Sequence, residues 1–301
     1  MRIRYLGTAA AEGFPAVFCN CAACIRAREL GELRTRSQAL IDETLLVDLP
    51  PETYYHAVRF GIDLSAVSHL LVTHSHTDHF YAQELVNRGY KFAYGMRAKT
   101  LRIYGDETVR EVFAEGTARE IKDDVRADIR FITAEPFTAF DCGGYEVYAL
   151  PAKHTPSERA LVYFIRKDGK GILYLNDTGL PDEGLYDFLR EHKLRADLVS
   201  FDCTLGGSQE IHSGRHMNVY ENAQVLEKLL RIGAAAPDVR AVITHFSHNA
   251  APFRKDMDSL AAKFGFIAAY DGMTIEIKTR RTCAAGFLTL YFIDDMGMTI
   301  P

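Results

Sequence analysis

The sequence predicts a single α/β domain with one large hydrophobic core. Of its 301 residues, 48% are hydrophobic and 25% are charged, which is enough apolar material for such a core. Short apolar, β-branched runs typical of buried strands alternate with segments of helical character along the chain. Several of these runs end at a histidine or an aspartate, so the strands that build the core would also present polar side chains at their ends.

The first quarter of the chain is expected to supply strands and short helices around a loop marked by Gly13 and Pro15. Asp42 and Glu43 form the expected turn of a hairpin, and Pro51 is a residue suited to the first turn of a helix. The expected strands are 3–7, 38–41 and 45–48, and the expected helices are 25–30 and 51–60.

The remaining elements follow from the same patterns of apolar runs, turn residues and caps. The segment KDGK marks a second hairpin, and Asn218 is a suitable N-cap for a helix. The expected strands are 70–73, 101–104, 129–132, 145–150, 161–165, 172–175, 198–201, 239–244 and 273–277. The expected helices are 82–88, 107–115, 181–192, 218–232 and 253–264.

The stretch LLVTHSHTDH, residues 70–79, joins a buried strand to four side chains of the kinds that bind metals. In an extended segment, side chains two residues apart point the same way, so His74 and His76 can approach one ion, while Asp78 and His79 face a neighbouring position. Imidazole and carboxylate ligands suit Zn, Mn or Fe. A polar loop that merely caps the strand is the alternative, and four ligand-type residues within six make it a poor one.

With this motif the chain resembles the metallo-β-lactamase superfamily of hydrolases. The resemblance implies a four-layer αββα sandwich, in which two mixed β-sheets face each other and are flanked by helices. It also implies three further ligands downstream. By position, the implied ligands are His74, His76 and His154 for one ion, and Asp78, His79 and His245 for the other, with Asp177 bridging the two.

Two divalent ions held in this way would activate a shared hydroxide as nucleophile and neutralise the oxyanion that forms on the substrate. The predicted reaction is therefore hydrolysis, with Asp78 serving the catalytic centre as a ligand of the second ion. Asp177 has a second interpretation, because an Asp before a helix often acts as its N-cap.

Three cysteines, Cys19, Cys21 and Cys24, form a CxCxxC cluster that indicates a metal knuckle rather than paired disulfides. His248, three residues beyond His245, is available as the fourth ligand of a closed structural zinc site. This combination resembles the cyclic phosphodiesterases of the carbon-phosphorus lyase pathway and their relatives. The other cysteines, Cys142, Cys203 and Cys283, are expected to be small buried hydrophobic residues.

The phosphodiesterase resemblance also implies a histidine outside the metal ligands that lies over the substrate phosphate, and His216 matches that position. Imidazole titrates near working pH, so His216 could protonate a leaving alkoxide or hydrogen-bond a phosphoryl oxygen. A helix-flanking surface histidine is the alternative, and His212 is the reserve candidate. The remaining histidines are expected to be structural or on the surface: His56, His69 and His192.

The start of the chain, GTAAAEGFPAVFCNC, also resembles the pyrroloquinoline-quinone biosynthesis protein B family, whose metal motif is altered. Because HSHTDH is intact here, we predict a phosphodiesterase acting on small phosphate esters, cyclic ones included, with two catalytic ions (Zn or Mn, with Fe as a further option) and one structural Zn. A metal-dependent oxygenase or cofactor-biosynthesis protein is the alternative. A non-catalytic binding protein is disfavoured because no ligand position is missing.

The formal net charge of −5 argues against a nucleic-acid platform, and no stretch approaches the roughly 18 apolar residues of a membrane span. We therefore expect a cytoplasmic protein with a small-molecule substrate and the capacity to form a homodimer. Residues 1–278 are expected to form the catalytic domain, and 279–301 an extension of unknown role.

Overall fold

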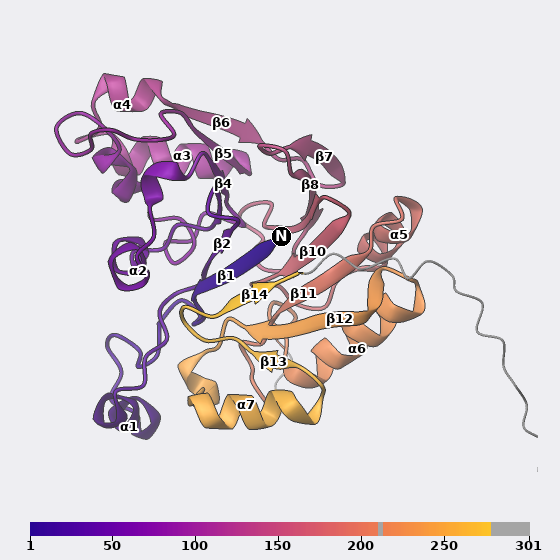
Figure 1. Cartoon of the computed structure of the whole chain (residues 1–301). Coiled ribbons are helices and arrows are strands. Elements are labelled where there is room, and N and C mark those ends of the chain that lie inside the picture. Colours follow the sequence, from indigo (N-terminus) through magenta and orange to yellow (C-terminus); the bar gives the residue numbers. More distant parts are fainter. Residues whose placement is uncertain (210–212, 278–301) are drawn as a thin grey trace, which may run out of the picture.

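Two seven-stranded β-sheets pack face to face in the computed structural model, which describes residues 1–209 and 213–277 (Figure 1). The first sheet contains, in spatial order, β14 (Thr274–Glu276), β1 (Arg2–Gly7), β2 (Gln38–Ile41), β3 (Leu45–Val47), β4 (His69–Leu71), β5 (Leu101–Gly105) and β6 (Ile129–Thr133). The second contains β13 (Ile267–Ala268), β12 (Ala235–Thr244), β11 (Ala196–Asp202), β10 (Lys170–Leu175), β9 (Leu161–Lys167), β8 (Glu146–Pro151) and β7 (Thr138–Asp141).

Helices lie on the outer faces of both sheets (Figure 1). The α-helices are α1 (Ala22–Leu30), α2 (Thr53–Phe60), α3 (Glu107–Thr117), α4 (Asp123–Ala127), α5 (Glu183–Glu191), α6 (Val219–Arg231) and α7 (Arg254–Lys263). Short 3-10 turns are η1 (Leu64–Ala66), η2 (Ala82–Asn87) and η3 (His248–Ala250).

Three apolar layers hold these elements together. The central layer lies between the sheets and includes Tyr5, Tyr163 and Tyr174, each at most 1% exposed. One outer layer joins the first sheet to α3 through residues such as Val109, and the other joins the second sheet to α5, α6 and α7. Because each sheet buries both faces, the predicted four-layer αββα sandwich is confirmed.

Within each sheet, the strands that carry polar residues at their ends share one direction. β10 runs parallel to β11, and β11 to β12, while β8 is antiparallel to β9, which is antiparallel to β10. In the first sheet β4 is parallel to both β3 and β5. The carboxyl ends of parallel strands meet at one edge of a sheet, and ligand sites of open α/β sheets form there.

Most of the predicted elements are present, and the differences have local causes. The segment predicted as a helix over 82–88 is a 3-10 turn. The helix predicted to begin at Pro181 begins at Glu183 with Asp182 as its N-cap, so Asp177 lies five residues before the cap and is not the capping residue. Asn218 does cap α6, through a reciprocal pair of hydrogen bonds with Glu221. Strands β7 and β13 and helix α4 were not predicted.

Several sequence-based expectations concern residues whose structure is not described, namely the reserve candidate His212, Cys283 and the extension 279–301. Cys142 and Cys203 are fully buried, as expected of small hydrophobic residues. No helix within the described part of the chain is long and apolar enough to cross a membrane.

Candidate metal centre

The strand ends at the shared edge bring histidines and aspartates from both sheets into one cluster. His74 follows β4, His154 follows β8, Asp177 follows β10 and His245 follows β12. The ligand-type atoms fall into groups in which all atoms lie within 4.8 Å of one another. Every catalytic ligand position predicted from the sequence is among them.

The first group consists of His74, His76 and His154. Nδ1 of His76 lies 3.0 Å from Nε2 of His74 and 3.2 Å from Nε2 of His154. Two nitrogens bound to one tetrahedral zinc, each at 2.0–2.1 Å, would be about 3.3 Å apart. The three imidazoles are therefore spaced as ligands of a single ion.

The second group consists of Asp78, His79, Asp177 and His245. Nε2 of His79 lies 3.3 Å from Nε2 of His245 and 3.1 Å from Oδ2 of Asp78. Oδ2 of Asp177 is 3.2 Å from this same His79 nitrogen and 3.4 Å from Nε2 of His74 in the first group. One carboxylate oxygen thus approaches both groups, which is the arrangement required of a bridging ligand.

Carboxylates behind the histidines orient their rings. Asp48 accepts a hydrogen bond from Nδ1 of His79 at 2.8 Å and from the backbone N–H of Thr73 at 2.8 Å. On the other side, Nδ1 of His245 contacts the Thr204 hydroxyl at 2.8 Å, and that hydroxyl donates to Asp202 at 2.9 Å. Each contact places a proton on Nδ1 and leaves Nε2 with a free lone pair for a metal.

The charge balance of the cluster also fits bound cations. Four carboxylates are at most 9% exposed, and no Lys or Arg within the described ranges forms an ion pair with any of them: Asp48, Asp78, Asp177 and Asp202. Oδ1 of Asp177 and Nδ1 of His154 are buried without a hydrogen-bond partner. Histidines are the charged partners of these carboxylates, and a histidine that binds a metal does so in its neutral form, so divalent ions would be needed to neutralise the buried carboxylates.

Protonation equilibria agree with ligand roles for the first group. Burial lowers the pKa of His154 to about 4, and burial together with His79 holds the pKa of His74 well below its ordinary value. Burial alone would raise the pKa of Asp177, but His245 and His216 hold it well below its usual range. His74 and His154 are therefore neutral imidazoles beside an ionised carboxylate, and these are the forms that bind metals.

Left-handed backbone conformations occur at three positions of the cluster. Asp48, Asp177 and His245 have φ angles of 63°, 52° and 59°. Non-glycine residues adopt such angles infrequently and at a cost of about 1–3 kcal/mol, and they concentrate at functional sites. Each angle occurs where a strand ends and the chain turns to direct a polar side chain into the cluster.

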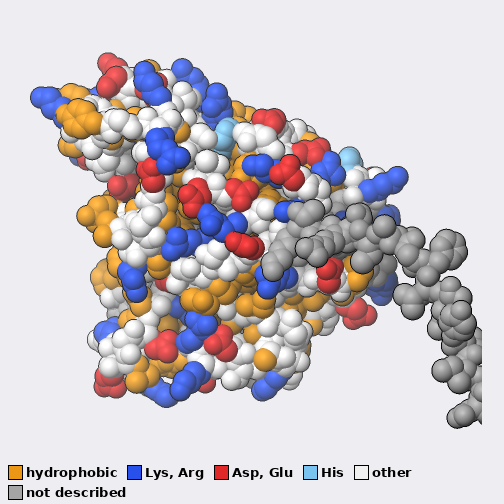
Figure 2. All heavy atoms as spheres, viewed as in Figure 1, with side chains coloured by type: hydrophobic (Ala, Val, Ile, Leu, Met, Phe, Trp, Pro, Cys, Tyr) orange, Lys and Arg blue, Asp and Glu red, His pale blue; other side chains and the backbone are white. Residues whose placement is uncertain are grey.

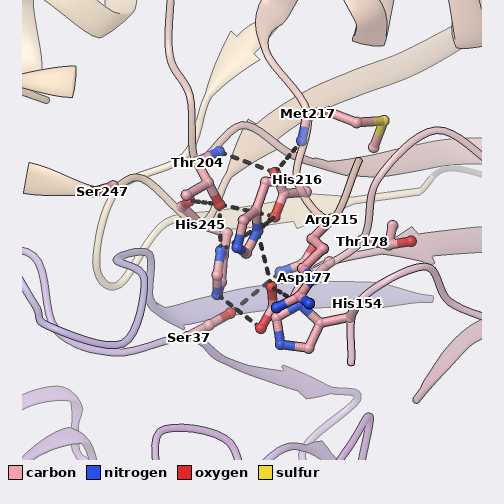
Figure 3. Close-up of polar contacts among 12 residues, drawn as sticks. Ser37, His154, Asp177, Thr178, Thr204, Arg215, His216, Met217, His245 and Ser247 are labelled. Atoms are coloured by element: carbon pink, nitrogen blue, oxygen red, sulfur yellow. Dashed lines mark hydrogen bonds and ion pairs between the residues drawn. The ribbon is translucent and has the colours of Figure 1, made fainter. Parts of the chain in front are cut away.

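His216 belongs to neither of these two groups but forms a third with Asp177, Asp202 and His245, whose ligand-type atoms also lie within 4.8 Å of one another. Figure 3 shows it next to Asp177, with His154 and His245 on the other sides of that carboxylate. Nδ1 of His216 is 3.1 Å from Oδ1 of Asp177 and 3.3 Å from Oδ2 of Asp202. Burial acts to lower the pKa of His216, but these two carboxylates raise it to about 10. The ring lines the cavity above the cluster and is 24% exposed.

The CxCxxC segment and His248 come together as predicted, in a fourth group away from the other three. Nδ1 of His248 lies 3.5 Å from Sγ of Cys24 and 3.8 Å from Sγ of Cys21, and a tetrahedral zinc with bonds of 2.3 and 2.0–2.1 Å separates such atoms by about 3.6 Å. The backbone N–H of Cys24 and the His248 ring lower the pKa of Cys21 to about 6, so its thiolate forms readily. The geometry fits a closed four-ligand site.

Glu12 connects the thiol group to the catalytic cluster. Its Oε1 accepts hydrogen bonds from the Ser247 hydroxyl at 2.6 Å and the His248 backbone N–H at 2.9 Å. Because Ser247 and His248 lie two and three residues beyond His245, Glu12 holds the loop that carries ligands of both sites.

Sequence reasoning missed Asp48, Asp202, Thr204 and Glu12. Asp48 and Asp202 each come at the end of an apolar run, in LLVD and LVSFD. This position, which the predicted ligands share, was the only feature of the sequence that could have identified them. The other three histidines behave as expected: His56 is buried and hydrogen-bonded, His69 is partly buried, and His192 is exposed.

Two facing sheets with a histidine and aspartate cluster at their strand ends support a metal-dependent hydrolase. The profile of the beta-lactamase superfamily domain matches residues 46–246, and the chain belongs to this family. A search of curated proteins found no significant match.

Solved structures with the same fold include the families that the sequence resembles. A diphosphatase of the PhnP family has 20% sequence identity and a TM-score of 0.66, with 92% of this chain and 98% of that chain covered. Zn²⁺-bound PqqB from Methylobacterium extorquens has 17% identity and a TM-score of 0.64, with 92% and 100% covered. The short form of human tRNase Z has 19% identity and a TM-score of 0.62, with 93% and 100% covered. At identities this low, the similarity shows that the fold is shared and shows nothing about the activity.

Proposed function

We propose that this metal-dependent hydrolase is a phosphodiesterase that acts on small phosphate esters. The observation that carries the proposal is the position of His216, an imidazole beside both metal groups that faces the cavity and is held by Asp202. A hydrolase that cleaves esters with alkoxide leaving groups needs a proton donor of this kind.

The proposed ligands are His74, His76 and His154 for one ion, and Asp78, His79 and His245 for the other, with Asp177 shared. Zn²⁺ or Mn²⁺ are the proposed catalytic ions, and Fe²⁺ is compatible with the same ligands. When bound, the ions would lower the pKa of water and neutralise charge on a phosphoryl oxygen.

The chain's own contribution to leaving-group departure is assigned to His216. Its Nδ1 faces Asp177 and Asp202, so Nε2 is the atom left to hold a proton for the substrate. With two carboxylates beside it the ring is held in the charged form, and a positioned acid contributes about 10²- to 10⁴-fold in rate.

We further propose a structural zinc on Cys19, Cys21, Cys24 and His248, supported by the spacing of the sulfur and nitrogen atoms. The substrate is proposed to be a small molecule and not a nucleic acid. On the face shown in Figure 2, Lys and Arg side chains are mixed with Asp and Glu and do not form a separate basic surface.

A cofactor-biosynthesis or oxygenase role of the PqqB type is the second candidate, favoured by the shared fold and by the N-terminal resemblance. The complete set of ligand positions in HSHTDH favours the phosphodiesterase.

Hydrolysis of bis(p-nitrophenyl) phosphate by protein loaded with Mn²⁺ or Zn²⁺ tests the proposal. We expect turnover that a chelator abolishes and that Asp177→Ala removes. His192→Ala, which alters an exposed histidine at the C-terminal end of α5, is the matched control and should keep its rate. Oxygen consumption without ester hydrolysis would instead support the second candidate.

A further inference from the structure

The three thiols of the CxCxxC segment differ in their exposure to solvent. Cys21 is exposed, Cys19 is partly exposed and Cys24 is buried. The ligand atoms of these cysteines and of His248 all lie within 4.8 Å of one another. Reversible oxidation of cysteine needs an accessible thiol and a second thiol beside it, because the second sulfur captures the first oxidation product. Cys21 and Cys24 meet both requirements.

Cys21 and Cys24 lie at the start of helix α1. Cys21 is the N-cap of the helix, and its Sγ accepts a hydrogen bond from the backbone N–H of Cys24 at 3.5 Å. Residues three apart in a helix lie on the same side with their Cβ atoms about 5–6 Å apart, which is close to the reach of a disulfide. A CxxC pair at a helix N-terminus is also the arrangement found in thiol oxidoreductases.

Helix α1 is joined to the rest of the protein through few buried side chains. Figure 1 shows it apart from both sheets. Its buried residues are Cys24 and Ala27, and Ala27 packs with Phe14 and Phe253 in a small cluster outside the three main apolar layers. Much of the attachment of α1 therefore depends on the thiol ligands and on His248.

The two sulfurs that would form the disulfide are also those that face His248. Nδ1 of His248 lies 3.5 Å from Sγ of Cys24 and 3.8 Å from Sγ of Cys21. The loop that carries His248 carries the catalytic ligand His245 as well. His245 has a separate anchor, since its carbonyl oxygen accepts a hydrogen bond from the Thr204 hydroxyl at 3.0 Å. A change at the thiols should therefore reach His245 in weakened form.

We propose that Cys21 and Cys24 form a reversible oxidation site, at which hydrogen peroxide converts two zinc-binding thiolates into a disulfide, releases the zinc and weakens metal binding at His245. The proposal rests on the thiol zinc site proposed above and does not depend on the identity of the substrate. Cys19 and His248 are the ligands left after oxidation, and two ligands are too few for a structural zinc site.

The reaction balances in two steps. The Cys21 thiolate attacks one peroxide oxygen, so an S–O bond forms, the O–O bond breaks and hydroxide leaves. The Cys24 thiolate then attacks the Cys21 sulfur, so the S–S bond forms, the S–O bond breaks and a second hydroxide leaves. The two sulfurs lose two electrons, the peroxide gains them, and two protons from solvent convert the hydroxides to water.

Protein that holds Mn²⁺ in the catalytic centre and Zn²⁺ in the thiol site tests the proposal. After peroxide treatment, removal of the peroxide by catalase and desalting, elemental mass spectrometry should show the loss of about one zinc per chain. The thiol count should fall by two. In the tryptic peptide 5–26, Cys21 and Cys24 should be joined and Cys19 should remain open to alkylation. Dithiothreitol with added zinc should reverse all three changes.

Two variants sharpen the test. Cys142→Ser removes a buried thiol between β7 and β8 and is the matched control, so it should lose zinc as the wild type does. In Cys24→Ser, peroxide should leave a sulfenic acid on Cys21, which dimedone traps, and no disulfide. Retention of zinc and of all thiols in the wild type, or a disulfide that joins Cys19 to Cys21, would overturn the oxidation site.

The affinity for Mn²⁺ reports the link to His245. Loss of a group that orients a metal ligand costs about 10- to 100-fold in metal affinity or activity, and we expect about tenfold here because Thr204 still holds His245. Paramagnetic resonance titration of free Mn²⁺ measures the affinity before oxidation, after it and after reduction, and equal affinities would overturn the link. If bis(p-nitrophenyl) phosphate is not hydrolysed, the proposed function fails, whereas zinc release and the peptide map still decide the oxidation site.

Discussion

Replacing Asp202 by Asn removes the charge behind His216, and it also removes the acceptor of the Thr204 hydroxyl that contacts His245. Oδ1 of Asp202 accepts hydrogen bonds from the backbone N–H groups of Thr204 at 3.0 Å and Met217 at 2.9 Å. The Asn carbonyl oxygen should take that place. Its NH₂ group then lies where Oδ2 faces His216, and it cannot accept the Nδ1–H of a charged imidazole.

The expected loss follows from this contact. A hydrogen bond to a charged partner contributes about 1.5–3 kcal/mol, which corresponds to a fall in kcat of about 10- to 150-fold. The fall should appear on a cyclic ribose phosphate, whose alkoxide leaving group needs a proton. It should be much smaller on bis(p-nitrophenyl) phosphate, because p-nitrophenolate leaves without protonation.

A double-mutant cycle separates this effect from a change in metal binding. Asp202→Asn combined with His216→Ala should be no slower than His216→Ala alone, since both remove the same proton donor. Asp202 also lies 3.3 Å from Nδ1 of His245, so metal content must be measured in each variant and kcat taken at saturating metal. Equal losses on both substrates, or additive losses in the cycle, would refute the proton-donor reasoning.

Three further predictions concern the metals and the core. Asp177→Ala should abolish turnover and lower the content of bound metal, because it removes the ligand that lies near both metal groups. Elemental mass spectrometry measures the metal content, and full activity with full metal content would contradict the bridging role. Cys21→Ser should lower the melting temperature, and it should reduce bound zinc by about one ion per chain. An unchanged melting temperature and zinc content would exclude the thiol site. His56 is buried and its pKa is lowered from 6.5 to about 4, so the unfolded chain takes up a proton between these values that the folded chain does not. The free energy of unfolding should therefore fall by about 3 kcal/mol as the pH drops from 6.5 to 4. In urea unfolding, His56→Gln should lack this fall.

The parts of the site that could be predicted from the sequence are those in which ligands lie close together along the chain. HSHTDH and CxCxxC each place at least three metal-binding residues within six positions, and in the structure these residues belong to the expected ligand groups. His154, Asp177 and His245 stand alone in the sequence, and the family resemblance was needed to select them. The αββα sandwich likewise came from the resemblance, because apolar runs indicate strands but not their order.

The supporting residues could not be predicted because their roles depend on pairing between distant segments. Asp48 reaches His79 because β3 lies beside β4, and Asp202 reaches His245 because β11 lies beside β12. Asp202 reaches His216 because the residues just before α6 lie against it, where the Met217 N–H donates to its Oδ1. Strand β7 was missed for a different reason. Its four residues are mostly exposed, so they lack the apolar alternation that marks a half-buried strand.

The central claim is that two ions share Asp177. Electron paramagnetic resonance of protein loaded with Mn²⁺ tests it most directly, since two manganese ions joined by a carboxylate oxygen are magnetically coupled and isolated ions are not. The structure predicts the spectrum of a coupled pair in the wild-type protein, because Oδ2 of Asp177 lies within 3.4 Å of ligand nitrogens from both groups. The coupling should be lost in Asp177→Ala. A wild-type spectrum of isolated Mn²⁺ at saturating metal would contradict the dinuclear centre.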